Sequence, residues 1–330
     1  MTLLKHSLPT KFAILAGIAA SLLALPTHVR AEDWNVQVGA QSHDKGNQVL
    51  AFLPNELWIH TGDTVNFISA TDEPHTISFL TNGQVRLPFT VGCPGTTPSG
   101  STVDGMSCVN SGELFNGQGY SVMFPTHGNY KLVCLIHNNM TGIIHVLDAG
   151  AALPHDQAFY DAEAADTRKD LLSSAGGLID HGDNTAPLDV TAGTGKIAAN
   201  GGGENTLSVV RFMHETKIVR VGATVEWTND DPVTPHTITF GFAVEPANPI
   251  PPSANVTVDA DGARHATVSS PNDNVHSGFI VAASQDQIGL PQTPSGVTRF
   301  RVTFTNTGIY NYKCVLHDDL GMVGEIVVLP

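Results

Sequence analysis

Basic residues are scarce in this chain of 330 residues: 16 Lys and Arg stand against 31 Asp and Glu, which gives a net charge of −15. The acidic residues are spread along the chain and do not form a tail. This balance argues against nucleic acid and anionic membrane surfaces as partners. It suits a cationic partner, and it also suits an exported protein whose acidic surface keeps it soluble.

Aromatic residues are also few, at 7%, and the sequence has no long heptad pattern. Glycine and proline are plentiful, with 32 and 20 residues. This composition favours an all-β fold with many turns. The length that follows the N-terminal segment suggests two domains of ordinary size.

A long apolar run occurs at the N-terminus, where Lys5 and Lys11 precede FAILAGIAASLLAL at 12–25. The run is shorter than the roughly 20 apolar residues of a transmembrane helix. Small residues stand before the expected cleavage point after Ala31. We therefore expect a cleaved signal peptide at 1–31, a periplasmic or secreted protein and no membrane anchor.

The rest of the chain contains an internal repeat, which we sought before any other pattern. Its segments alternate apolar and polar residues as β-strands do, so each repeat is predicted to be a β-sandwich. The matching segments are WNVQVGA (34–40) with LDVTAGTG (188–195), PHTISF (74–79) with PHTITF (235–240), and GNYKLVCLIHNNMTGIIHVL (128–147) with GIYNYKCVLHDDLGMVGEIVVL (308–329).

The repeat predicts domain 1 at 32–149, a linker at 150–184 and domain 2 at 185–330. The linker is rich in alanine and acidic residues, and one helix is expected from about 156 to 173, with a stop at Gly176-Gly177. Its apolar stripe is weak, which favours a spacer between independently folding domains. Two segments rich in Pro, Ser, Asn and Asp are predicted to be loops of domain 2: 241–274 and 283–296.

Two of the four cysteines, Cys93 and Cys108, lie in a loop with little apolar content. Outside the cytosol, such a pair favours a disulfide. The alternative is an extra metal site, but no histidine lies near them in the sequence. We expect the disulfide, at a distance from any metal.

The other two cysteines each begin a short motif that also contains a histidine and a methionine, CLIHNNM and CVLHDDLGM. A thiolate, two imidazoles and a weak, long thioether bond form the site that selects copper for electron transfer. The second imidazole is expected from the Pro-His-Thr of each repeat. The predicted ligands are His75, Cys134, His137 and Met140 for site 1, and His236, Cys314, His317 and Met322 for site 2.

The axial residue of site 2 depends on the alignment of the two repeats. Alignment from the histidine places Leu320 opposite Met140, whereas alignment from the following strand places Met322 there. We favour Met322, because the strand fixes side-chain direction while loop length can vary. Leu320 is then expected as an apolar surface around an exposed His317, with Gly321 permitting a tight bend.

These motifs resemble those of the cupredoxins, in particular the plastocyanin and amicyanin group. The C-x2-H-x2-M spacing at 134–140 is that of amicyanin, and the C-x2-H-x4-M spacing at 314–322 is that of plastocyanin. The resemblance covers both domains and implies two Greek-key β-sandwiches in tandem, each with a blue, type 1 copper. One departure is that Thr76 and Thr237 stand where plastocyanin-like sites often have asparagine. A threonine hydroxyl is expected to hydrogen-bond similarly.

The resemblance implies an electron carrier, which the N-terminal segment predicts to be exported, with a cytochrome or a copper oxidase or reductase as its redox partner. The rim of site 2 has two acidic residues, Asp318 and Asp319, and so suits a basic partner such as a cytochrome. His137 and His317 are expected near the surface, where they would form the exit for the electron. Copper sequestration or delivery is the alternative, because it needs the same ligands. A two-domain copper oxidase or nitrite reductase is disfavoured, since Val133 and Lys313 occupy the positions before the cysteines and the chain has no His-x-His. We therefore expect no enzymatic activity.

Overall fold

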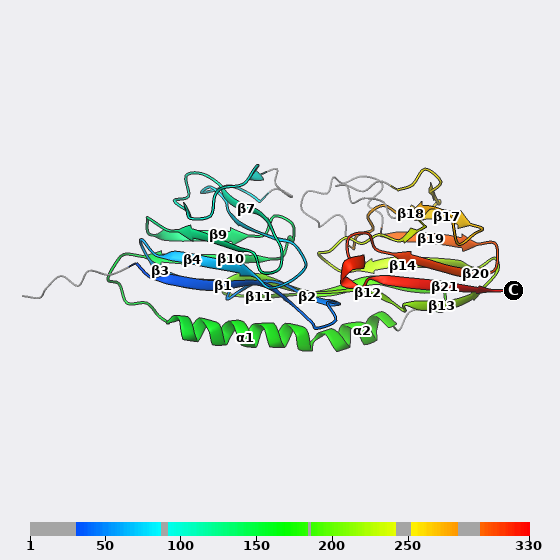
Figure 1. The fold of residues 1–330 in the computed structure, drawn as a ribbon, viewed down its shortest axis with the longest axis horizontal. Coiled ribbons are helices and arrows are strands. Elements are labelled where there is room, and N and C mark those ends of the chain that lie inside the picture. Colours follow the sequence, from blue (N-terminus) through cyan, green and yellow to red (C-terminus); the bar gives the residue numbers. More distant parts are fainter. Residues whose placement is uncertain (1–30, 87–91, 184–185, 242–251, 283–297) are drawn as a thin grey trace, which may run out of the picture. The chain divides into compact units, whose positions relative to one another are not determined.

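The fold is built on one sheet of 11 strands that runs through both repeats, and each repeat adds a sheet of five strands (Figure 1). The computed structural model describes residues 31–86, 92–183, 186–241, 252–282 and 298–330. The predicted signal peptide, up to residue 30, and the predicted loop at 283–296 lie outside the described residues.

Domain 1 is a sandwich whose buried residues, among them Val36, Phe67, Ile77 and Ile144, join the two sheets in one core. Its part of the large sheet contains β1 (Asp33–Gln41), β2 (Asn47–Leu53), β4 (Thr64–Ser69), β6 (Ser101–Thr102) and β8 (Gly119–Met123). Its second sheet contains β3 (Glu56–His60), β5 (His75–Phe79), β7 (Val109–Leu114), β9 (Gly128–Val133) and β10 (Thr141–Leu147).

Domain 2 repeats this arrangement around a core that includes Trp227, Phe300 and Ile326. Its part of the large sheet contains β11 (Asp189–Asn200), β12 (Gly203–Met213), β14 (Thr224–Asp230), β16 (Thr257–Val258), β17 (Arg264–Val268) and β19 (Arg299–Phe304). Its second sheet contains β13 (Thr216–Arg220), β15 (Thr239–Phe240), β18 (Val275–His276), β20 (Gly308–Lys313) and β21 (Val323–Leu329). The all-β prediction is confirmed, whereas the segment predicted as a loop at 241–274 includes the strands β16 and β17.

The two domains join through an antiparallel pairing of β2 with β12, in which Leu50 lies opposite Thr206 and Gln48 opposite Ser208. Hydrogen bonds between backbones therefore continue from one domain into the other. Val233 of domain 2 also packs into the core of domain 1. The prediction of independently folding domains did not anticipate this shared interface. The apolar and polar pattern of β2 or of β12 indicates a strand but does not indicate which other strand it pairs with.

The linker forms two helices, α1 (Gln157–Ser173) and α2 (Ala175–Asp183). Asp156 caps α1 by accepting a hydrogen bond from the amide of Phe159. The predicted helix is confirmed, but the predicted stop is wrong, since Gly176 and Gly177 lie inside α2. Each glycine costs a helix about 1 kcal/mol, and tertiary packing of neighbouring apolar residues outweighs a cost of this size.

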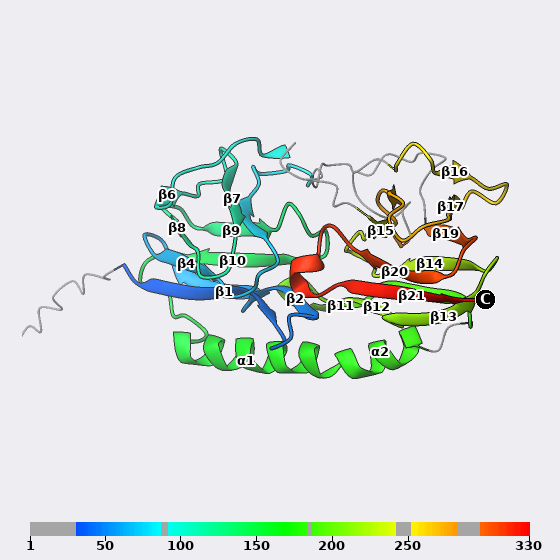
Figure 2. The same ribbon diagram turned by 45° about the vertical axis from the view of Figure 1, so that its right-hand side comes forward.

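Both helices cover the face of the large sheet where the domains meet (Figures 1 and 2). The buried residues of this layer come from the helices and from strands of both domains: Ala40, Val49, Ala51, Leu53, Leu171, Ala175, Leu207 and Val209. The linker thus belongs to a shared core and is not a spacer. No helix in the described part of the chain is long and apolar enough to span a membrane.

Candidate metal centre

Site 1 brings together His75 at the start of β5, Cys134 directly after β9 and His137 in the loop that follows. Nδ1 of His75 lies 3.1 Å from Nδ1 of His137. Nδ1 of His137 lies 3.7 Å from Sγ of Cys134. All three side chains are buried. The predicted cysteine and histidines of domain 1 therefore lie next to one another in the core.

Site 2 has the same arrangement in domain 2. Nδ1 of His236 lies 3.1 Å from Nδ1 of His317. Sγ of Cys314 lies 3.9 Å from Nδ1 of His236 and 3.4 Å from Nδ1 of His317. These three side chains are also buried.

The donor atoms of both groups fit a bound metal ion. Two bonds of about 2.0–2.3 Å, as imidazole nitrogen and thiolate sulfur make to a metal, place their donor atoms between about 3 and 4 Å apart. The separations in both groups fall in this range. One sulfur with two imidazole nitrogens is a donor set suited to copper.

The predicted axial residues, Met140 and Met322, are fully buried in the same cores as Cys134 and Cys314. The amide of Cys134 donates to the carbonyl of Met140 at 3.0 Å, and the amide of Cys314 donates to the carbonyl of Met322 at 3.1 Å. The two methionines thus occupy equivalent backbone positions, as the strand-based alignment predicts.

Leu320 lies in a 3-10 helix, Asp318–Leu320, which ends at Gly321 with a φ of 89°. A left-handed conformation of this kind favours glycine, so the expected bend is present. Leu320 itself is only 5% exposed and belongs to the core of domain 2. The expectation that Leu320 forms a surface around the histidine is wrong, because the 3-10 helix turns this side chain inward.

The two threonines that follow the first histidines tie the cysteine loops to the sheet. The hydroxyl of Thr76 accepts from the amide of Leu135 at 2.7 Å, and the hydroxyl of Thr237 accepts from the amide of Val315 at 2.9 Å. In addition, the amide of Thr76 points at the Cys134 sulfur from 3.5 Å. The expected hydrogen-bonding role of threonine is present at both sites.

Two glycines of the first strands leave room for the first histidines. A Cβ on Gly39 would lie 2.7 Å from Nε2 of His75, and a Cβ on Gly193 would lie 2.1 Å from Nε2 of His236. Both glycines have a positive φ. The sequence did contain this signal, since the two glycines align in the first matched segment of the repeat.

The surroundings of each cysteine favour its thiolate. Burial alone would raise the pKa of Cys134, but hydrogen bonds from His137 and His75 outweigh it and hold the pKa well below the usual value. The same balance of burial against its two histidines lowers the pKa of Cys314. The thiolate is the form of cysteine that binds a metal.

The imidazoles of the second histidines have raised pKa values. Burial opposes the charged ring, but the Cys134 sulfur and Glu73 outweigh burial and raise the pKa of His137 to about 9. For His317, the Cys314 sulfur and Glu73 together raise the pKa to about 10. In each metal-free site, the shifts therefore favour a cysteine thiolate next to a protonated imidazole of the second histidine.

The expectation that His137 and His317 reach the surface is wrong. Each is only 3% exposed, and their Nε2 atoms both point at Glu73. The reason is the domain interface, which covers the loops that carry both histidines. Nearby, Asn139 of domain 1 donates to the Glu204 carboxylate of domain 2 at 3.0 Å.

Sequence reasoning also missed Arg86, which holds the loop of site 1. Its Nε donates to the carbonyl of Cys134 at 3.0 Å, and its Nη2 donates to the carbonyl of Leu135 at 2.9 Å. In domain 2, the loop of site 2 is held by Arg211, whose Nη1 donates to the carbonyl of Leu320 at 2.7 Å. Neither arginine lies near its site in sequence, so no local motif could have identified it.

Cys93 and Cys108 are joined in a disulfide, with their Cα atoms 5.8 Å apart. The predicted pairing is present in the structure. Cys93 packs against Val133 and Leu135, the neighbours of Cys134 in the chain. The disulfide therefore supports the strand that leads to site 1, closer to the site than the sequence suggested.

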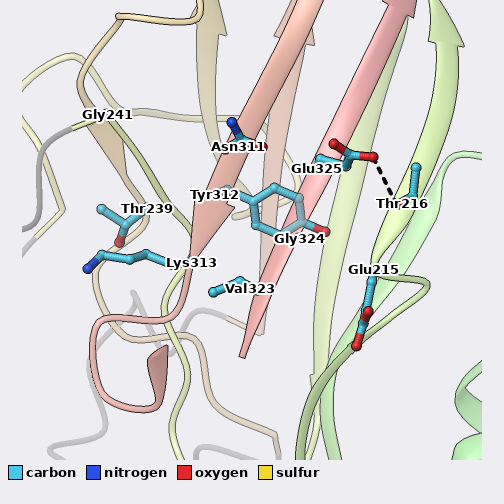
Figure 3. Close-up of a pocket in the computed structure, with 10 residues that line it drawn as sticks. All are labelled: Glu215, Thr216, Thr239, Gly241, Asn311, Tyr312, Lys313, Val323, Gly324 and Glu325. Carbon is cyan, nitrogen blue, oxygen red and sulfur yellow. Dashed lines mark hydrogen bonds between the residues drawn. The ribbon is translucent and has the colours of Figure 1, made fainter. Parts of the chain in front are cut away.

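A surface pocket of about 450 Å³ lies beside the strand that leads to Cys314 (Figure 3). Its lining includes Tyr312, Lys313, Glu215 and Glu325, and Lys313 forms an ion pair with Asp318. None of the candidate ligands lines this pocket. It does not open onto either candidate centre.

A β-sandwich with a buried group of one cysteine and two histidines, present twice, defines a protein of two similar domains, each with a candidate metal centre. Residues 38–147 and 202–329 match the family described as copper binding proteins, plastocyanin/azurin family, and the chain belongs to this family. The predicted resemblance to the cupredoxins is confirmed.

A plastocyanin and several amicyanin mutants are among the individual proteins to which the chain is similar. The chain is 31% identical over 129 residues to chloroplastic plastocyanin of Chlamydomonas reinhardtii, which covers 38% of this chain and 74% of that protein. A solved structure of a reduced amicyanin mutant is 21% identical, and the match covers 35% of this chain and 82% of the amicyanin chain, with a TM-score of 0.25. A Cu(I) amicyanin mutant is 20% identical with the same coverage and a TM-score of 0.25.

Proposed function

We propose that this chain is an exported electron carrier with two type 1 copper sites. The observation that carries the proposal is the duplicated, buried group in which one sulfur and two Nδ1 atoms face a common point. Site 1 would use His75, Cys134 and His137 with Met140 as the axial residue. Site 2 would use the equivalent residues of domain 2, with Met322 as the axial residue.

Copper held by a thiolate, two imidazoles and a weak thioether exchanges one electron and leaves no open position for a substrate. The chain's own residues favour this use. Thr76 and Thr237 anchor the cysteine loops, and Gly39 and Gly193 allow the first histidines to pack closely on the sheet. A rigid donor set resists rearrangement when the charge of the metal changes.

The N-terminal segment supports a periplasmic or secreted location, and the acidic balance of the chain favours a basic redox protein, such as a cytochrome, as the partner. Of the two aspartates on the loop of site 2, Asp318 is paired with Lys313, whereas Asp319 is exposed. The acidic rim of site 2 is therefore smaller than the sequence suggests.

Copper sequestration or delivery is a second candidate, and the burial of His137 and His317 is the observation that favours it. A partner cannot touch either imidazole directly, which slows electron exchange in comparison with an exposed histidine. Reduction by a basic cytochrome, followed by stopped-flow absorption, separates the two candidates. An electron carrier is reduced rapidly at both sites, whereas a storage protein is not.

Copper titration of the metal-free protein with visible absorption tests the metal sites themselves. We expect a thiolate-to-copper absorption band that saturates at two metal ions per chain. Cys134→Ser should remove one half of the band, Cys314→Ser should remove the other half, and the double variant should be colourless. Loss of the whole band in either single variant would contradict separate ligand sets.

A further inference from the structure

Glu73 lies between the two candidate centres, although it belongs to domain 1. Its Oε1 is 3.1 Å from Nε2 of His137, and its Oε2 is 3.6 Å from Nε2 of His317. The carboxylate is almost fully buried, with 7% of the residue exposed. One side chain therefore contacts the second histidine of both sites.

A buried carboxylate is costly unless hydrogen bonds and opposite charges compensate for the loss of water. The two imidazoles supply this compensation. Each oxygen of Glu73 thus has one imidazole as its partner.

This carboxylate is not part of the repeated structure. Glu73 precedes the Pro-His of domain 1, where Thr234 precedes the Pro-His of domain 2. The hydroxyl of Thr234 accepts a hydrogen bond from the hydroxyl of Ser208 at 3.2 Å. The two domains therefore differ at this position, which lies where they meet. Since domain 2 has a threonine there, the fold of a single domain does not require a carboxylate.

We propose that Glu73 is a positioning residue shared by both sites. Its Oε1 accepts a hydrogen bond from Nε2–H of His137, its Oε2 faces Nε2 of His317 at ion-pair distance, and the two contacts turn Nδ1 of each ring toward its cysteine. This inference rests on the proposed copper sites. A carboxylate behind a metal-bound histidine fixes the ring and makes it a more basic ligand. One residue would therefore set the properties of both sites together.

A carboxylate in contact with both imidazoles favours Cu(II) over Cu(I), so Glu73 is expected to lower both reduction potentials. Glu73→Gln removes the charge and leaves a single acceptor oxygen, so both imidazoles cannot be held as before. The potentials of both sites should rise, and the thiolate-to-copper absorption of both should shift.

The experiment uses Cys134→Ser and Cys314→Ser as parent proteins, because each retains one site for measurement. Glu73→Gln is added to each parent, and the potential of the remaining site is measured by spectroelectrochemistry. Glu204→Gln is the matched control, since the Glu204 carboxylate also joins the domains, but it does so by accepting a hydrogen bond from the side chain of Asn139 and not from a candidate ligand. We expect a rise with Glu73→Gln in both parents and no shift with Glu204→Gln.

A rise in only one parent would overturn the sharing of Glu73, and no rise in either would overturn its role at the sites altogether. If the parents bound no copper, the proposed function would fail instead. Histidine NMR of the metal-free protein gives a reading that needs no copper. The Nε2–H signals of His137 and His317 should be protected from exchange in the wild type, and both should move in Glu73→Gln. Unmoved signals would overturn the proposal.

Discussion

The amide of Cys314 donates a hydrogen bond to the carbonyl of Met322 at 3.1 Å. This bond closes the loop of site 2 and repeats the bond of Cys134 with Met140, which measures 3.0 Å. The loop of domain 2 is longer, but both methionines return to the same place beside the cysteine. The equivalence of these backbone positions favours Met322 over Leu320 as the candidate axial residue.

Met322→Gln should therefore shift the absorption and the potential of site 2 while copper remains bound, because an axial thioether bond is weak. Leu320→Ala is the matched control in the same loop. Since Leu320 is buried, its truncation should lower the free energy of unfolding by about 2–5 kcal/mol and leave the spectrum nearly unchanged. A spectral change in Leu320→Ala with none in Met322→Gln would favour the histidine-based alignment.

The sequence could predict the candidate ligands because they belong to motifs that occur twice. Each motif is local, and the repeat supplies the distant Pro-His. In contrast, Glu73 acts across the domain interface, and its contact with His317 depends on the pairing of β2 with β12. No periodicity in a single strand identifies its neighbour in another domain, so neither the interface nor the buried histidines could be predicted.

The disulfide between Cys93 and Cys108 should contribute stability without holding the metal. It closes a loop with a sequence separation of 15, so its loss should lower the free energy of unfolding by about 3 kcal/mol. Cys93 packs on Val133 and Leu135, whose side chains alternate with that of Cys134. The double variant Cys93→Ser/Cys108→Ser should therefore keep its colour. Denaturant unfolding and a visible spectrum test this, and a bleached variant would place these cysteines in the metal site.

A fragment of residues 186–330 should associate or aggregate, in contrast to the independently folding domain that the sequence analysis predicts. Removal of domain 1 and the helices exposes β12 as an edge strand, together with the buried Leu207 and Val209. Unpaired apolar edges of this kind favour association. Size-exclusion chromatography at several concentrations tests the prediction, with full-length Cys134→Ser as the control that retains site 2 in its native surroundings. A monomeric fragment that binds one copper would contradict it.

Site 2 should have the lower reduction potential of the two, because it has an additional carboxylate. Asp231 is fully buried, and its Oδ2 lies 4.0 Å from Nε2 of His236. In domain 1, Thr71 precedes His75 in the corresponding turn, and its uncharged hydroxyl is hydrogen-bonded to Gln48.

A nearby negative charge stabilises Cu(II) relative to Cu(I), so Asp231→Asn should raise the potential of site 2 and leave that of site 1 unchanged. Asparagine keeps an oxygen for the amides of Val233 and Thr234, which both donate to Oδ1 of Asp231 at 2.9 Å. The loop should therefore remain folded. Asp63→Asn is the control, because Asp63 is equally buried but accepts its hydrogen bonds from Glu32, Trp34 and His60. Redox titration of the two absorption bands tests the order, and a higher potential at site 2 in the wild type would show that the Asp231 charge does not govern it.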